Sequence, residues 1–363
     1  MRLEHFQKLK PHCLACDRSE TGQASALQIA GILQSDDEHI IEAVLQCSNS
    51  ACLAEYPVID GIPFLFRNLK SYLAQHAAMI LQRYDLSSVT QSLLGDCCGS
   101  DAAFNVTRQQ ISSYAWAHYA DLLPKQFPKM PDVASTLAVQ RSFEDLCETH
   151  PHGPVLDVGC SVGRTTFELA DRTEQLVLGI DINPAMLRLA ATALRTGRID
   201  FPLRRNGLVY EIASATLDYA RADRVDFWAC DAADLPFPTE TFKGQQCLNT
   251  LDSVSSPGAL LLSLGSRLAA GGHLNLACPY DWSSGVTVED QWIGGHSQRA
   301  DHGGDPVDVL RRLLQQVPDY RELFTVVAEQ DDVGWEVRLH DRSEMHYRLH
   351  ALVLERRSSA DGK

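Results

Sequence analysis

The feature that most constrains the fold is a short apolar run that ends in an acidic residue and two glycines. Residues 154–163 read PVLDVGCSVG, and the stretch from Arg164 to Ala170 continues with helical spacing. This pattern predicts a strand, a tight turn and the start of a helix, which together form a nucleotide-type pocket. The spacing D-x-G-x-x-x-G lacks the glycine trio of the dinucleotide fingerprint, and an acid before the turn suits a cationic ligand better than a phosphate.

Two further apolar runs each end in an acidic residue. Residues 176–181 (LVLGID) end at Asp181, where the Rossmann-type pattern places the carboxylate that binds ribose hydroxyls, and residues 225–231 (VDFWACD) end at Asp231. Three such strand ends in sequence resemble the S-adenosylmethionine (SAM) site of class I methyltransferases. The resemblance implies that the first turn meets the methionine part, the second acid the ribose and the third acid the adenine amino group. The alternative is that Gly159 and Gly163 merely permit tight packing.

The resemblance assigns a set of residues at the first turn and at the following strand ends to SAM. These residues are Asp157, Gly159, Cys160, Gly163, Asp181, Ile182, Asp231, Ala232 and Asn249.

Near the N-terminus, two close pairs of cysteines predict a metal site. Cys13 and Cys16 form one pair and Cys47 and Cys52 the other, and four thiolates at this spacing can close tetrahedrally around a structural Zn²⁺. Unligated cysteines are the alternative. Residues 55–66 (EYPVIDGIPFLF) resemble the final strand of small zinc-ribbon domains that accompany some RNA and protein methyltransferases. This resemblance covers residues 10–68 and leaves open whether the ribbon is an interaction module or a structural appendage.

These patterns predict an α/β fold with several parts. We expect a Rossmann-like class I methyltransferase sheet with helices on both faces, a small N-terminal zinc ribbon and a helical lid segment. The expected boundaries are 1–68 for the zinc ribbon, 69–150 for the helical linker or lid, 151–357 for the methyltransferase domain and 358–363 for a disordered tail. We expect the ribbon and the catalytic domain to have separate cores. Residues 198–224 form an insertion that is typical of a substrate wall.

Composition limits the partners and the compartment. The 363 residues include 32 basic and 47 acidic side chains, a formal net charge of -15, which opposes non-specific adhesion to nucleic acid or anionic lipid. Eleven cysteines, an odd number scattered through apolar strands, are typical of a reduced compartment. Because no apolar run is long enough to span a bilayer and no signal peptide is visible, we expect a cytoplasmic protein with a small-molecule substrate, either monomeric or as a homodimer.

The acceptor is indicated by residues after the fourth and fifth strands. The fourth strand ends in NTLD (249–252) and not in the N-P-P-Y of enzymes that methylate base amines. Residues 278–282 (CPYDW) and 289–295 (EDQWIGG), together with 157–170, resemble the methyltransferase domain of ovothiol biosynthesis, which methylates an imidazole nitrogen of mercaptohistidine. The resemblance covers residues 150–357. The iron-dependent sulfoxide synthase that is fused to that family's enzyme is replaced by a zinc ribbon and helices, so a different acceptor stays open.

Several side chains follow as candidates for the acceptor site. Asp252 would accept a hydrogen bond from the imidazole N–H and so fix which nitrogen attacks, and Tyr280, Trp282 and Trp292 would wall the ring. Arg338 would pair with the amino-acid carboxylate. Packing in the core is the alternative for each aromatic residue. The catalytic candidates are Asp252, Tyr280 and Trp292, and the substrate-binding candidates are Tyr114, His118, Trp282, His296 and Arg338.

Three functions remain in competition. The leading hypothesis is an N-methyltransferase for a thiol- or selenol-bearing histidine derivative. The second is a ribosomal or transfer RNA base methyltransferase that grips RNA with the zinc ribbon, against which the net charge and the missing N-P-P-Y count. The third is a non-enzymatic SAM-binding regulatory subunit, which would tend to have lost one of the three strand-end acids.

Overall fold

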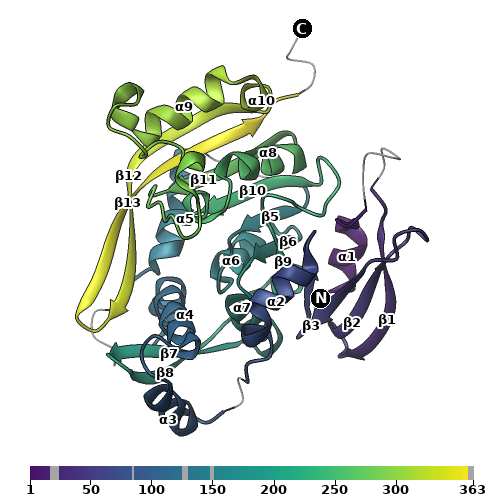
Figure 1. The fold of residues 1–363 in the computed structure, drawn as a ribbon, viewed down its shortest axis with the longest axis vertical. Coiled ribbons are helices and arrows are strands. Elements are labelled where there is room, and N and C mark those ends of the chain that lie inside the picture. Colours follow the sequence, from purple (N-terminus) through teal and green to yellow (C-terminus); the bar gives the residue numbers. More distant parts are fainter. Residues whose placement is uncertain (17–23, 84–85, 125–129, 148–150, 359–363) are drawn as a thin grey trace.

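The computed structural model describes residues 1–363 except 17–23, 84–85, 125–129, 148–150 and 359–363 (Figure 1). Most of the tail expected at 358–363 therefore lies outside the described residues. The described chain is organised around an 11-stranded sheet with the order β1-β2-β3-β4-β9-β6-β5-β10-β11-β13-β12. None of the described helices is both long and apolar enough to cross a membrane.

The catalytic half of this sheet is a parallel sheet with an antiparallel hairpin at its end. Strands β9, β6, β5, β10 and β11 are parallel, β13 is antiparallel to β11, and β12 is antiparallel to β13. Strand–helix alternation along this part of the chain confirms the predicted α/β fold. The strands are β5 (Val155–Val158), β6 (Val177–Asp181), β9 (Val225–Cys230), β10 (Phe242–Leu248), β11 (Leu268–Cys278), β12 (Phe324–His340) and β13 (Ser343–Arg356).

The N-terminal cysteine-bearing segment is not a separate unit. Its strands β1 (Leu27–Ser35), β2 (Ile40–Cys47), β3 (Glu55–Ile59) and β4 (Ile62–Leu65) are antiparallel to one another, and β4 then pairs in parallel with β9. One hydrophobic cluster holds Leu45 and Val58 from this segment together with Leu156 and Trp228 from the catalytic strands. The expectation of separate cores is wrong, because β4 continues the catalytic sheet and brings both sets of apolar side chains onto common faces.

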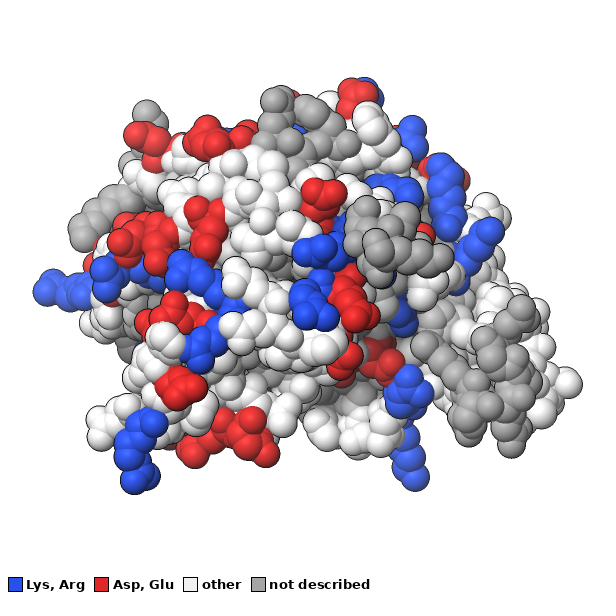
Figure 2. All heavy atoms as spheres, turned by 90° about the horizontal axis from the view of Figure 1, so that it is seen from above, with Lys and Arg blue, Asp and Glu red and all other residues white. Residues whose placement is uncertain are grey.

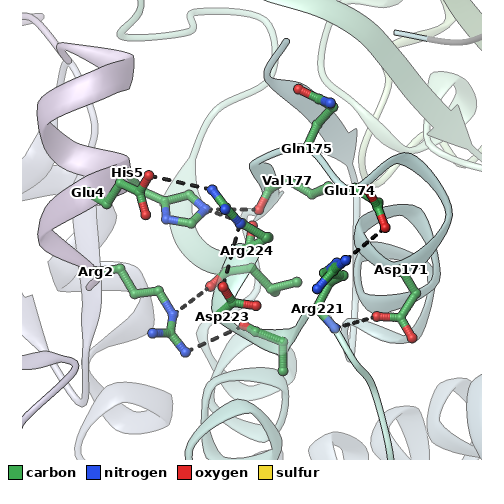
Figure 3. Close-up of polar contacts among 12 residues, drawn as sticks. Arg2, Glu4, His5, Asp171, Glu174, Gln175, Val177, Arg221, Asp223 and Arg224 are labelled. Carbon is green, nitrogen blue, oxygen red and sulfur yellow. Dashed lines mark hydrogen bonds and ion pairs between the residues drawn. The ribbon is translucent and has the colours of Figure 1, made fainter. Parts of the chain in front are cut away.

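Polar contacts also fix the N-terminal helix α1 (Leu3–Leu9) to the catalytic sheet, as Figure 3 shows. The guanidinium Nε of Arg2 donates to the Val225 carbonyl at 3.1 Å, and Nε2 of His5 lies 3.0 Å from the Arg224 carbonyl and 3.3 Å from that of Val177. These carbonyls stand at the starts of β9 and β6, so α1 covers the end of the sheet that is opposite the expected site.

Helices cover the sheet and roof its carboxyl end. In Figure 1, α4 and α5 lie beside the β12–β13 hairpin, whereas α2 lies near α7. Asn183 and Ser256 cap α7 and α8 through side-chain oxygens that accept backbone N–H groups, as the sequence indicates. The helices are α2 (Leu69–Ile80), α3 (Ser88–Cys98), α4 (Ala103–Tyr119), α5 (Ser135–Leu146), α6 (Arg164–Thr173), α7 (Pro184–Thr196), α8 (Pro257–Arg267), α9 (Pro306–Gln316) and α10 (Pro318–Arg321).

The structure defines two segments more closely than the sequence does. Residues 198–224, predicted as an insertion typical of a substrate wall, contain a separate hairpin formed by β7 (Arg198–Asn206) and β8 (Val209–Thr216). The sequence predicts that the helix beginning near Pro257 ends at Ala270, before Gly271 and Gly272. Helix α8 instead ends at Arg267, because Leu268 already pairs with Phe242 before an irregularity restores the register at His273. The two glycines therefore belong to an irregular stretch within β11 and not to a turn before it.

Candidate methyl-transfer site

A cavity of about 500 Å³ lies at the carboxyl ends of the parallel strands, where α/β sheets bind their ligands. Most residues that the sequence assigned to SAM line it, whereas Cys160 and Gly163 are not among its lining residues. The assigned residues that line the cavity are Asp157, Gly159, Asp181, Ile182, Asp231, Ala232 and Asn249.

The first turn requires glycine at both predicted positions. Gly159 has a φ of 70°, and a Cβ there would lie 2.1 Å from Oγ1 of Thr250. Gly163 has a φ of 87°, and a Cβ there would lie 2.6 Å from the ring of Phe227. The two glycines thus allow both the left-handed backbone and the close packing of the turn, as the packing interpretation expects, and their role in binding SAM stays a prediction.

Asp157 holds this turn in place through three hydrogen bonds within the protein. Its Oδ2 accepts from the hydroxyls of Thr165 and Thr166 at 2.7 Å each, and its Oδ1 accepts from Nε2 of Gln246 at 3.1 Å. Burial raises the pKa of the Asp157 carboxyl. Because its oxygens are engaged with α6 and β10, Asp157 acts on a ligand chiefly through its charge and by fixing the turn.

Asp181 and Asp231 stand at the ends of neighbouring strands with their carboxylates tied to the backbone. Asp181 accepts the N–H of Ser161 at 2.9 Å and that of Asn183 at 2.8 Å, and Asp231 accepts the N–H of Ala233 at 2.9 Å. Burial raises the pKa of Asp181. A carboxylate has about four acceptor positions, so both side chains keep capacity for hydroxyl or amino donors of a ligand.

Five buried polar side-chain atoms at the cavity have no partner among the described residues. They are Oγ of Ser161, Oδ1 of Asn249, Nδ1 of His118, Oγ1 of Thr136 and Nε1 of Trp335, and all five residues line the cavity. Because an unsatisfied buried polar group costs about 1–3 kcal/mol, such atoms indicate a ligand that completes their hydrogen bonds. The mixture of donors and acceptors suits the amino-acid end of SAM, so the residues present fit this cofactor.

A second cavity of about 230 Å³ adjoins the first. Both are lined by Tyr114, Asn249 and Trp335, and the second is also lined by Asp252 and Asp281. The two cavities meet at the end of β10. We call the first the donor compartment and the second the acceptor compartment, after the roles that the sequence analysis predicts for their lining residues.

Asp252 is the buried carboxylate of the acceptor compartment. Its side chain is 3% exposed, its Oδ2 accepts the N–H of Asp281 at 2.7 Å, and burial raises its pKa. The neighbouring Asp281 accepts the Tyr347 hydroxyl at 3.2 Å. Oδ2 of Asp252 is thus fixed by a backbone N–H, whereas Oδ1 accepts the Ser253 hydroxyl at the long distance of 3.5 Å and keeps capacity for a donor of a ligand.

Helix α4 brings Tyr114 and His118 to the donor compartment. His118 is buried, and burial, helped by the nearby Arg164 guanidinium, lowers its pKa to about 3. Arg164 itself pairs with Asp121 at 3.1 Å. His118 is therefore a neutral imidazole at ordinary pH, so it presents a hydrogen-bonding group and not a charge.

The remaining aromatic candidates lie outside the lining of both compartments. The Tyr280 hydroxyl lies 2.7 Å from Nδ1 of His350, and Trp282 stacks on Trp292 with ring centroids 6.1 Å apart. Trp292 donates from Nε1 to the Thr287 carbonyl at 2.8 Å. Tyr280 and Trp282 flank Asp281 and pack against the main hydrophobic cluster, so the role of the three rings as walls remains a prediction that the geometry does not favour.

Arg338 and His296 also lie apart from the cavities. Arg338 pairs with Asp341, donates to the Arg204 carbonyl at 2.9 Å and lies over the ring of Trp116 at 4.8 Å. His296 is exposed. Neither residue is among the lining residues of either compartment.

Strand β12 supplies lining residues that the sequence reasoning missed. Trp335, Val337 and Leu339 all line the acceptor compartment, and Tyr347 on β13 lines it beside them. The three β12 residues alternate along the strand, so they share one face. The sequence shows this alternation of residues 335, 337 and 339. It does not show which face of β12 lines the acceptor compartment, because that depends on where the β12–β13 hairpin ends relative to α4.

The four predicted metal ligands come together in the N-terminal segment. The sulfur atoms of Cys13, Cys16, Cys47 and Cys52 all lie within 4.8 Å of one another, with 3.8 Å between Cys13 and Cys52 and 3.3 Å between Cys16 and Cys47. A tetrahedron with Zn–S bonds of about 2.3 Å has edges of roughly 3.8 Å. The donor set and its spacing therefore fit a structural Zn²⁺.

Comparison with known proteins agrees with the fold of the catalytic half. Residues 156–276 match the family described as "Methyltransferase domain". The chain contains a methyltransferase domain. With the strand order above, it is a class I SAM-dependent methyltransferase domain. A curated relative, phosphoethanolamine N-methyltransferase of Triticum aestivum, is 24% identical over 233 residues, which are 56% of this chain and 41% of the relative. The chain thus spans less than half the length of that relative.

Solved structures with a similar fold include other methyltransferases. A SAM-dependent methyltransferase of Methanosarcina mazei has a TM-score of 0.38 and 19% identity, covering 60% of this chain and 97% of its own. Phosphoethanolamine N-methyltransferase 2 of Haemonchus contortus, in complex with phosphomonomethylethanolamine and S-adenosylhomocysteine, has a TM-score of 0.39 and 11% identity, covering 61% and 52%. A Haloferax volcanii complex of the Trm112 methyltransferase activator with a putative methyltransferase has a TM-score of 0.38 and 13% identity, covering 74% and 98%.

Proposed function

We propose that the protein is a SAM-dependent N-methyltransferase that acts on an imidazole nitrogen of a small histidine derivative bearing a thiol or selenol. The observation that carries the proposal is Asp252, a buried carboxylate that lines the acceptor compartment directly beside the donor compartment. Support for this acceptor also comes from the resemblance of residues 150–357 to the ovothiol family. Because the relatives match only part of the chain, they do not identify the substrate of the whole protein, and its identity is part of this proposal.

In the donor compartment, SAM would supply a methyl group on a positively charged sulfur. Asp181 would accept hydrogen bonds from the ribose hydroxyls, and Asp231 with Ala232 would meet the adenine. Ser161 and Asn249 would satisfy their unpartnered oxygens on the amino-acid end. The surrounding carboxylates favour a cationic sulfonium, and the roof formed by α4 and β12 restricts water.

In the acceptor compartment, the charges favour a neutral nitrogen nucleophile. The described lining of both compartments contains aspartates but neither lysine nor arginine. When the lone pair of a neutral imidazole nitrogen bonds to the methyl carbon, the C–S bond of SAM would break and its electron pair would stay on the sulfur of S-adenosylhomocysteine. The imidazolium cation that results would then release its N–H proton to solvent. An ionised Asp252 that accepts this N–H holds the ring in one orientation and stabilises the charge that develops.

The same charges count against anionic acceptors. A phosphate ester such as the substrate named for the Triticum aestivum relative would bring its negative charge close to Asp252 and Asp281. An RNA backbone would meet the same repulsion, and Figure 2 shows acidic and basic side chains interspersed over the face in view and not gathered into a basic patch. The RNA hypothesis is therefore the weaker alternative, and a purely regulatory subunit would not need the acceptor compartment.

We further propose that the four cysteines hold a structural Zn²⁺ and that the protein works in the cytoplasm. The sulfur spacing supports the zinc, and free cysteines throughout the described chain suit a reducing compartment. Zinc at this site would crosslink the loop before β1 to the end of β2 and so stabilise the edge of the common sheet.

The test of the function is a methyl-transfer assay on the full chain. Purified protein is incubated with methyl-labelled SAM and, in separate reactions, histidine, mercaptohistidine, selenohistidine, carnosine, phosphoethanolamine and transcribed RNA. We expect label on an imidazole nitrogen, located by mass spectrometry and NMR. Label only on RNA or only on phosphoethanolamine would overturn the proposal.

A further inference from the structure

A third cavity lies on another side of α4 and has no assigned role. It has a volume of about 550 Å³, within the range of small-molecule sites, and is bordered by α3, α4, α7 and the β7–β8 hairpin. Figure 1 shows α3, α4 and this hairpin next to one another at the lower end of the molecule. Its lining shares no residue with the two methyl-transfer compartments. The apolar part of the lining is formed by Phe104, Ile111, Leu189, Ile199, Phe201 and Ile212.

Arg108 is the buried cation of this cavity. Its side chain lies on α4 and is 5% exposed. Its Nη1 donates to the Gln91 carbonyl at 3.5 Å and to Oδ1 of Asn105 at 3.4 Å, both long contacts, and its Nε has no partner among the described residues. The ring of Tyr210 lies 4.1 Å from the guanidinium carbon.

Arg108 makes no ion pair within the described chain, which is unusual for a buried guanidinium. Burial lowers its pKa from the ordinary arginine value. The Asp96 carboxylate attracts the guanidinium without forming an ion pair with it, and the rings of Tyr210 and Phe104 lie 4.1 and 5.3 Å from the guanidinium carbon. These interactions offset only part of the cost of burying the charge, because they do not replace an ion pair. The retention of this charge indicates that an anion completes the site.

The rest of the lining has the same sign. Besides Arg108, three arginines line the cavity, at positions 83, 188 and 198, and Asp200 is the one acidic residue among the described lining. Asp200 pairs with Arg198 at 2.9 Å. Arg188 pairs with Asp60 at 2.7 Å. Carboxylates thus balance two of these arginines, and the positive charge that the cavity offers to an anion is that of Arg108.

We propose that this cavity is a second binding site, which takes a small amphipathic carboxylate. The carboxylate pairs with the Arg108 guanidinium, and the apolar chain packs against Phe104, Ile111 and Phe201. The site is independent of the identity of the methyl acceptor. Because Gln110, Tyr114 and His118 on a neighbouring face of α4 line the donor compartment, an occupant of this cavity touches the helix that roofs the methyl-transfer site.

Octanoate is a suitable probe, with octanamide as its neutral analogue and octylammonium as its cationic analogue. Calorimetric titration of the full chain is expected to show one binding site for octanoate and no detectable binding of octylammonium. The affinity for octanoate should be at least about tenfold higher than that for octanamide, which is the scale of one charge-assisted hydrogen-bonded pair. Arg108→Gln is expected to remove this preference for the anion. Arg198→Gln is the matched control, because Arg198 lines the same cavity but is already paired, and it should keep the preference.

A second readout separates binding from misfolding. Octanoate should raise the melting temperature of the wild-type chain and leave that of Arg108→Gln unchanged, while S-adenosylhomocysteine stabilises both. Equal binding of octanoate and octanamide to the wild-type chain would overturn the proposal, and so would an absence of octanoate binding at about 10 mM. The comparison between the two probes needs no variant, so it decides the question even if Arg108→Gln fails to fold.

Discussion

Replacing Asp252 by asparagine tests the acceptor site most directly. The change keeps the size of the side chain and an oxygen that can accept the Asp281 N–H, now at 2.7 Å, so the loop should stay in place. What is lost is the negative charge beside the developing imidazolium. At an effective dielectric constant of about 20, two unit charges roughly 4 Å apart attract by about 4 kcal/mol. The amide dipole retains part of this, so we expect a loss of about 1.4–4 kcal/mol in the transition state, or about tenfold to a thousandfold in turnover.

The pH dependence provides an independent check of the same role. Burial raises the pKa of Asp252, and the ionised form is the one that accepts the imidazole N–H. Turnover should therefore fall as the pH is lowered, and the fall should begin at a pH higher than the pKa of an ordinary aspartate carboxyl group. The Asp252→Asn variant should lack this limb and retain only the fall that comes from protonation of the acceptor itself.

The assay is steady-state methyl transfer from labelled SAM, with S-adenosylhomocysteine affinity measured by calorimetry. The affinity should be nearly unchanged in Asp252→Asn, because the donor compartment is intact. Asp281→Asn is the control, since Asp281 is exposed and its backbone contact to Asp252 does not depend on its side chain. Full activity in Asp252→Asn, or an equal loss in Asp281→Asn, would refute the assigned role.

Three further predictions concern the cofactor site, the metal and the buried histidine. Asp181→Ala should weaken SAM binding by about 2–4 kcal/mol, through the loss of charge-assisted hydrogen bonds to ribose, and an unchanged calorimetric dissociation constant would exclude this role. Elemental analysis should find about one zinc per chain, and the Cys16→Ser variant should lose this zinc and have a lower melting temperature for the entire chain. Cys97 is exposed and lies outside the cluster, so the Cys97→Ser control should keep both the zinc and the melting temperature. The pKa of His118 is lowered to about 3, so its contribution to stability is complete above the unfolded value of about 6.5 and is lost as the pH falls below it. In denaturant titrations, the free energy of unfolding of the wild-type chain should therefore exceed that of His118→Asn by a margin that shrinks by about 1.4 kcal/mol per pH unit below about pH 6.5. A margin that does not change with pH would contradict the burial of a neutral imidazole.

Much of the donor compartment could be read from the sequence because its signals are local. An apolar run that ends in an acid, followed by glycines or by Asn183 and Pro184, defines a strand, a turn and a helix start within about ten residues. The parallel sheet then brings Asp181 and Asp231 to one edge without further information. The signal of the four cysteines is equally local, since the two members of each pair lie only a few residues apart in the sequence.

The acceptor compartment could not be read in the same way, because it depends on long-range placement. Trp335 and Tyr347 line the acceptor compartment because the β12–β13 hairpin is long and its far end projects past the other strands to meet α4. Tyr280, Trp282 and Trp292 matched a family signature, but signatures record positions that recur and do not separate lining from packing. Here the Trp282–Trp292 stack lies outside the lining of both compartments.

The continuity of the sheet has a consequence for how the cysteine cluster and the SAM site behave together. Strand β4 pairs with β9, and the residue after β9 is Asp231. Just beyond β4, Arg67 donates from Nε and Nη2 to the two carboxylate oxygens of Asp234 at 2.7 and 2.8 Å, and from Nη1 to the Leu14 carbonyl at 2.9 Å, between Cys13 and Cys16. One guanidinium thus links the loop that carries Cys13 and Cys16 to the loop that follows β9. Because these parts share strands, core and this contact, they should unfold in one cooperative transition, and two separate calorimetric transitions would show that the common sheet does not couple them.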